Sequence, residues 1–133
     1  DLQDFLVIPV GAGDYVTALD WLLRVRASAA ALMRAGGLSI LLADEGGLSP
    51  GFDSARAALD LMVQAIEKAG LRPGADAAIA LDVAASELHE GGVYRLARQG
   101  QTLTGAEMAG YVADLVRAYP IVSVEDALEQ DDW

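Results

Sequence analysis

The sequence predicts an α/β fold in which short buried strands pair in parallel and alternate with amphipathic helices. Short apolar runs at residues 5–10, 77–83 and 121–124 have the length of strands and are too short for typical helices. The run at 77–83 is almost wholly apolar, as in a strand that is covered on both faces. Between the runs lie segments whose apolar residues recur at helical spacing.

The first strand is followed by a capped helix. Phe5–Val10 is a short apolar run, which is typical of a buried strand. Asp14 is placed to cap a helix that we expect over Tyr15–Ala35 and that Gly36 ends. The residues near one face of this helix are apolar, namely Leu19, Leu22, Val25 and Leu32.

The segment Leu38–Ala43 is apolar but only six residues long. It fits a strand and an extended buried loop equally well, so its own residues leave both interpretations open. After the turn signal Pro50-Gly51, a second helix is expected over Ser54–Ala69, with Gly70 as its stop signal.

The second half of the chain continues the alternation. Ala77–Val83 is the most apolar strand candidate, whereas Glu87–Gly100 is polar and predicts an exposed hairpin. Thr104 and Glu107 have the spacing of a capping box, which predicts a helix that ends before Pro120.

The composition excludes several classes of protein. The 133 residues are 53% hydrophobic and 22% charged, which is typical of a globular chain, and the net charge of −11 disfavours nucleic acid or an anionic membrane as partner. The absence of cysteine fits the reducing cytoplasm. No apolar run has the length of a membrane span. We expect the sequence to be a section of a longer protein at both of its ends.

Acidic residues follow the apolar runs. Asp82 interrupts one, Glu125 ends another, and Glu45 follows the segment at 38–43. In α/β folds, function collects where parallel strands end, and hard cations such as Mg²⁺ prefer carboxylate oxygens. For any single one of these acids, a helix cap or a solvated loop is the favoured explanation, and only the three together make a shared site an equal alternative. Asp82 fits those explanations least, because its neighbours are apolar and it precedes no obvious helix.

Four ordered stretches resemble the enolase family: "LQDFLVIPVGA", "ADEGGLSP", "AIEKAGLRPGADAAIALDVAASE" and "YPIVSVEDALEQDDW". The resemblance covers residues 1–133 and implies the first part of the C-terminal TIM-like barrel domain, with the N-terminal domain and the remaining barrel absent. Phe5–Pro9 would then be a strand antiparallel to the others, which starts at the face where they end. The fold expected is therefore an incomplete barrel, and Leu38–Ala43 is expected in a loop.

The resemblance also implies roles for individual residues. Asp82 and Glu125 match two of three carboxylates that hold Mg²⁺, and Glu125 also contacts the substrate. Glu45 matches the acid that assists the leaving hydroxyl. Gln3 and Asp4 match a Gln-Glu pair that lines the substrate site. The shorter Asp4 would hold its carboxylate about 1 Å further back, which can cost on the order of a hundredfold in rate. Leu48 also departs from the family, which usually has an aromatic residue there.

The reaction implied is loss of water from 2-phosphoglycerate to give phosphoenolpyruvate in glycolysis, by a protein that forms a homodimer when complete. The base is missing from this stretch. The single lysine, Lys68, lies in an amphipathic helix, and the single histidine, His89, reads as a solvated loop residue. In the family, the catalytic lysines follow this stretch. The chain alone is therefore expected to be inactive, and open barrel edges would make it poorly soluble or oligomeric.

Two alternatives remain beside the glycolytic enzyme. One is an enolase-like enzyme of a phosphonate pathway, which the change at Asp4 allows. The other is a catalytically incomplete fragment that acts as a binding or interaction module, which the missing base favours.

Overall fold

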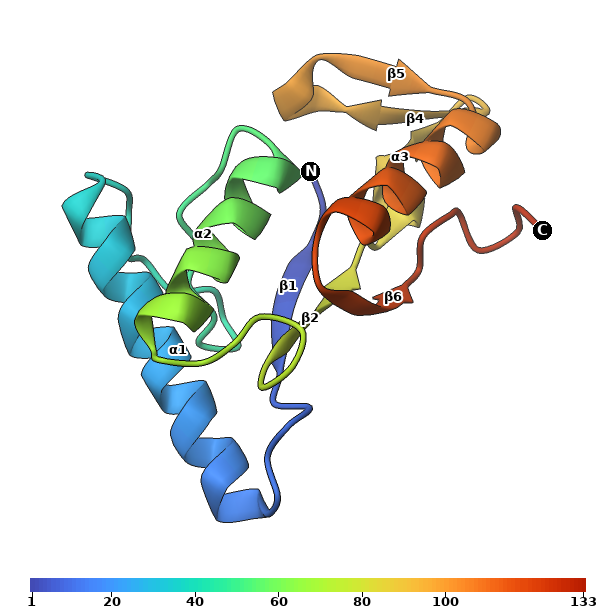
Figure 1. Ribbon diagram of the computed structural model, residues 1–133. Coiled ribbons are helices and arrows are strands. Elements are labelled where there is room, and N and C mark those ends of the chain that lie inside the picture. Colours follow the sequence, from blue (N-terminus) through green and yellow to red (C-terminus); the bar gives the residue numbers. More distant parts are fainter.

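Three strands form the main sheet of the computed structural model, which describes residues 1–133 (Figure 1). They are β1 (Asp4–Ile8), β2 (Ala78–Asp82) and β6 (Ile121–Glu125), in the order β1-β2-β6. β2 and β6 are parallel, whereas β1 runs antiparallel to β2. Both predictions about strand direction are confirmed, and the sheet is open, as expected of an incomplete barrel.

Each helix begins at a side-chain cap. α1 (Tyr15–Ala35) follows Asp14, whose carboxylate accepts a hydrogen bond from the Thr17 backbone N–H at 2.9 Å. α2 (Ala55–Lys68) is capped in the same way by Ser54. α3 (Gly105–Ala118) begins with the predicted capping box, in which Thr104 and Glu107 satisfy one another's backbone N–H groups. These caps fix the helix starts within one residue of the prediction.

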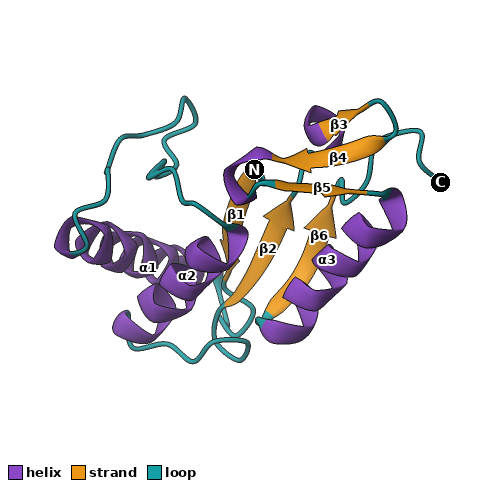
Figure 2. Cartoon of the chain, turned by 90° about the horizontal axis from the view of Figure 1, so that it is seen from above, coloured by secondary structure: helices purple, strands orange, loops and turns teal.

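One face of the main sheet forms the core with the helices. Alternate residues of β2 and the residue after it are buried there against side chains from all three helices, since successive residues of a strand face opposite sides. The fully or almost fully buried members include Ile79, Leu81, Val83, Leu59, Ile66, Met108, Leu115 and Val25. Figure 2 shows α1 and α2 beside β1 and β2, with α3 along β6. Asp4, Asp82 and Glu125 alternate with the core-facing residues, so they lie on the other side of the sheet.

The polar segment at 87–100 corrects one prediction. The predicted hairpin is present, because β3 (His89–Glu90) and β4 (Val93–Leu96) pair antiparallel across Gly91-Gly92, but it is not fully exposed. It belongs to a second sheet completed by β5 (Gln101–Leu103), which lies near the ends of β2 and β6 (Figure 2). The central strand buries Tyr94 and Leu96 completely. Their alternation with Val93 and Arg95 is a half-buried strand pattern that the surrounding polar residues concealed.

Two short 3₁₀ turns, Ala85–Leu88 and Ala97–Gln99, flank the second sheet. The open question about Leu38–Ala43 is also resolved, because the segment forms a loop with a single isolated bridge between Leu42 and Leu48. None of the helices combines the length and the apolarity that crossing a membrane requires.

Candidate functional site

Three carboxylates are aligned at one end of the main sheet. Asp4 pairs in register with Asp82, and Asp82 pairs with Glu125. We call these three residues the acidic row. It forms because β1 begins at the edge where the parallel strands β2 and β6 end. Like charges directly opposite one another on neighbouring strands repel, so a bound cation would stabilise this arrangement.

The backbone just beyond the acidic row is tightly held. The Val83 N–H donates to the Glu125 carbonyl at 3.1 Å, and the Ala85 N–H donates to the Asp126 carbonyl at 3.0 Å. Two non-glycine residues here have left-handed backbones, Ala84 at φ 48° and Asp126 at φ 47°. Such conformations cost free energy and persist where surrounding contacts impose them. The two chain segments therefore remain joined past their strands.

Asp82 is half-buried, and one of its oxygens already has a partner. Oδ1 accepts a hydrogen bond from the Ala84 N–H at 3.1 Å. This contact supplies a local role that sequence analysis did not identify, and it leaves Oδ2 for another ligand. Asp4 and Glu125 are exposed. The row consequently offers carboxylate oxygens to solvent, as a site for a hydrated cation requires.

Glu45 lies on an exposed tight turn between α1 and α2. The turn is closed by the Gly46 N–H, which donates to Ala43 O at 2.9 Å, and by the Ala43 N–H, which donates to Gly47 O at 2.8 Å. Gly46 has φ 84°, a left-handed conformation that favours glycine. Arg26 of α1 donates to the Gly46 carbonyl at 2.8 Å. An arginine that sequence analysis did not single out thus holds the residue after Glu45.

A cavity of about 520 Å³ lies between α1, α2, the start of β1 and the loop at 47–52. Gln3, Asp4, Leu48 and Arg26 all line it, and most of the other lining residues are apolar. The cavity brings the predicted substrate residues of β1 together with the loop that follows Glu45. Glu45, Asp82 and Glu125 are not among its lining residues.

A second arginine joins the end of the same loop to the start of β1. The Arg98 guanidinium donates to the Gly51 carbonyl at 3.2 Å, while the Arg98 backbone N–H donates to the Asp1 carboxylate at 3.0 Å. Gln99 reaches the other oxygen of Asp1 at 3.3 Å. These contacts bind the loop and the Gln3-Asp4 stretch to one another on either side of the cavity.

The chain does not complete a metal site alone. No three His, Asp or Glu side chains are arranged to hold a metal ion together. The neighbouring carboxylates of Asp82 and Glu125 nevertheless fit Mg²⁺, which is usually bound by one or two carboxylates together with water and substrate oxygens.

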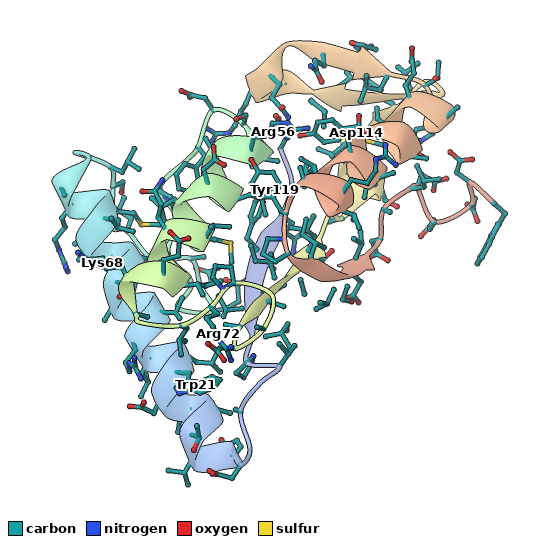
Figure 3. The ribbon with its side chains drawn as sticks, in the orientation of Figure 1. Trp21, Arg56, Lys68, Arg72, Asp114 and Tyr119 are labelled. Carbon is teal, nitrogen blue, oxygen red and sulfur yellow. The ribbon has the colours of Figure 1, made fainter.

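Neither candidate base is part of the acidic row. Lys68 is exposed at the last turn of α2, as expected of a surface residue (Figure 3). His89 was expected to be a solvated loop residue, but it begins β3 and is half-buried, with its ring centroid 5.0 Å from that of Tyr94. The polar character of its neighbours hid this packing.

Comparison with known proteins agrees with the geometry. Residues 1–133 match the family described as "Enolase, C-terminal TIM barrel domain". The chain is also 45% identical over its full 133 residues to "Enolase 1" of Methanospirillum hungatei. It spans 31% of the length of that protein.

Proposed function

The chain belongs to the enolase family, and from that premise we propose that the complete protein removes water from 2-phosphoglycerate to give phosphoenolpyruvate. The observation that carries the proposal is the acidic row, which has two carboxylates on neighbouring parallel strands and a third from the antiparallel strand beside them. In this proposal residues 1–133 are the first part of the barrel domain. The match of the whole chain to the family supports it.

Asp82 and Glu125 are proposed to bind Mg²⁺ from their adjacent strands. The pairing holds the two side chains in one row, and the Ala84 N–H fixes one oxygen of Asp82. When bound, Mg²⁺ would offset the negative charge that develops on the substrate carboxylate. Glu125 would also contact the substrate.

Gln3, Asp4 and Glu45 are proposed to act on the substrate itself. Asp4 begins β1 as the register partner of Asp82, with Gln3 just before it, and both residues would orient the phosphorylated acid beside the acidic row. Glu45 would protonate the departing hydroxyl as a general acid. Its position on a turn tied to α1 by Arg26 supports this role, because a proton donor must be held at a fixed place to assist a leaving group.

The base that removes the α-proton is proposed to come from outside residues 1–133, as the family resemblance implies. Lys68 lies at the end of a surface helix, and His89 packs on Tyr94 in the second sheet. We further propose a homodimer and, because glycolysis runs there, a cytoplasmic location. Both rest on the family alone.

The test is an assay of the purified complete protein with 2-phosphoglycerate and Mg²⁺, followed by the ultraviolet absorbance of phosphoenolpyruvate. We expect turnover that chelation of Mg²⁺ abolishes and that added Mg²⁺ restores. Absence of turnover with intact ligand binding would refute the glycolytic assignment.

A phosphonate-pathway enzyme is the second candidate, and Asp4 is the observation that favours it. Asp4 occupies the place of a family glutamate, so a substrate of different shape could be preferred. Turnover of a phosphonate analogue in preference to 2-phosphoglycerate would establish this candidate. A complete protein that binds neither substrate would instead favour the interaction module.

A further inference from the structure

Tyr94 is completely buried, yet its hydroxyl group makes two hydrogen bonds to one distant segment. It donates to Asp132 Oδ2 at 2.8 Å and accepts from the Glu129 backbone N–H at 2.9 Å. Both partners belong to the segment that follows β6. The hydroxyl of a β4 residue therefore attaches the chain that leaves Glu125 to the second sheet.

The same segment is attached at a further point. The Gln130 N–H donates to Ser86 Oγ at 3.2 Å, and Ser86 lies in the 3₁₀ turn after β2. Closer to the strands, the two backbone bonds from Val83 and Ala85 join the segments just beyond Asp82 and Glu125. Residues 126–132 are thus held from both the β2 side and the β4 side.

Asp132 reaches Tyr94 across the start of α3, where there is no side chain in the way. A Cβ atom on Gly105 would lie 2.7 Å from Asp132 Oδ2, so a side chain at position 105 would require the carboxylate to shift. Gly105 is the first residue of α3, and the positive end of the helix dipole favours a negative charge there. Burial raises the pKa of Tyr94, so its hydroxyl keeps the proton that it donates.

We propose that Tyr94 is a positioning residue that, through the segment 126–132, holds Glu125 beside Asp82 in the geometry a divalent cation requires. The inference rests on the proposed function of the acidic row. Tyr94 touches neither the substrate nor the cation. Its ring fills the core, whereas its hydroxyl fixes the course of the chain immediately after a metal-binding residue. Groups that orient metal ligands typically contribute tenfold to a hundredfold to metal affinity or activity.

The experiment compares Tyr94→Phe with Tyr119→Phe in the complete protein. Tyr119 is a matched control, because its hydroxyl donates to Asp60 Oδ1 at 2.7 Å and it lies at the other end of β6, just before the strand begins (Figure 3). Both substitutions delete one hydroxyl that is bonded to an aspartate. Calorimetric titration measures the Mg²⁺ dissociation constant without substrate, and thermal melting measures stability.

We expect Tyr94→Phe to raise the Mg²⁺ dissociation constant about tenfold, whereas Tyr119→Phe leaves it within twofold. High Mg²⁺ should restore the turnover of Tyr94→Phe, because the ligands remain and only their placement is relaxed. Asp132→Asn, which keeps an acceptor oxygen for the Tyr94 hydroxyl, should weaken binding less than Asp132→Ala. If Tyr94→Phe does not fold, this second pair of variants decides the question, since both spare the buried ring.

Equal Mg²⁺ affinities for the unaltered protein and Tyr94→Phe would overturn the positioning role and leave the proposed function intact. Equal losses in the Tyr94 and Tyr119 variants would also overturn it, because they would reflect general stability. Failure of the unaltered complete protein to bind Mg²⁺ would instead refute the proposed function, on which the inference depends.

Discussion

Asp82 at the end of β2 is the parallel register partner of Glu125 at the end of β6. The pairing brings together two carboxylates that are far apart in the sequence, and it places them at the edge where the antiparallel β1 begins. Opposed like charges are unfavourable without a counter-ion. The relationship therefore supports the proposal that a cation binds here and that both acids hold it.

Loss of either acid should weaken Mg²⁺ binding in the complete protein. We expect Asp82→Asn and Glu125→Gln each to raise the Mg²⁺ dissociation constant by at least about tenfold, because each removes one charged oxygen ligand. Calorimetric titration measures the change. Asp114→Asn is the control, since Asp114 is an exposed acid of α3 that pairs with Arg117 (Figure 3). Unchanged affinity in both test variants would remove the two residues from the metal site.

Glu45→Gln should separate chemistry from metal binding. The substitution keeps the size of the side chain but removes the proton that the leaving group needs, so kcat should fall on the order of a hundredfold or more. The Mg²⁺ dissociation constant should stay unchanged. Steady-state kinetics and titration on the same preparation measure both. Asp53→Asn, at an exposed acid further along the loop, serves as control. A loss of metal affinity equal to that of Asp82→Asn would show that Glu45 is a ligand instead.

Arg26 should matter through the turn that it holds. Arg26→Ala removes the donor to the Gly46 carbonyl, so Glu45 would lose its fixed position and kcat should fall about tenfold. Amide hydrogen exchange at residues 43–47 should become faster. An effect on catalysis that did not loosen this turn would leave the exchange unchanged. Arg34→Ala tests for general effects of charge removal from α1. Unchanged exchange at the turn in Arg26→Ala would contradict the tether.

The local signals in the sequence predicted the helices well. Asp14 and the Thr104-Glu107 box act on the backbone within three residues, so their effect can be read without tertiary structure. Ser54, which was expected as the first residue of the second helix, is instead its cap. The parallel pairing of β2 and β6 was predicted from the alternation of buried strands with helices, whereas the antiparallel direction of β1 followed from the family resemblance. The start of β1 at the acidic edge could be expected once β1 was taken as antiparallel.

Contacts between distant segments could not be read in the same way. The bond from Arg26 to Gly46 depends on how the loop returns to α1, and nothing in the helical pattern marks that arginine. Tyr94 lies in a segment with glycines and charges on both sides, which outweighed the two-residue alternation of β4. The partners of β4 lie outside the strand itself, in α3, in the turn Ala85–Leu88 and, for the Tyr94 hydroxyl, at Glu129 after β6, so a local pattern does not contain them.

Acid should weaken the turn that leads into β2. Hydrogen bonds from the side chain and backbone of Arg72 lower the pKa of Asp76 to about 2 from its usual 3.8. Because the folded pKa lies below the unfolded one, the stabilisation is present above about pH 4 and is lost as the pH falls through about 2. Asp76→Asn should therefore lower the urea midpoint at neutral pH, and the difference from the unaltered protein should shrink towards about pH 2 and vanish below it. A difference that persists in strong acid would rule out the ionised pair as its source.

Asp4→Glu tests what the departure from the family does. Asp4 lies in the acidic row, so lengthening its side chain by one methylene moves the carboxylate about 1 Å towards a ligand bound at that row. If the complete protein is a glycolytic enolase that tolerates a retracted carboxylate, kcat with 2-phosphoglycerate should rise, by up to on the order of a hundredfold. Asp53→Glu makes the same change on the exposed loop and should have no effect. If the site is adapted to another substrate, Asp4→Glu should leave turnover of 2-phosphoglycerate low and reduce turnover of that substrate. Asp4→Glu should thus raise turnover of the preferred substrate if that substrate is 2-phosphoglycerate, and lower it if the substrate is another compound. The variant therefore separates the two candidate reactions.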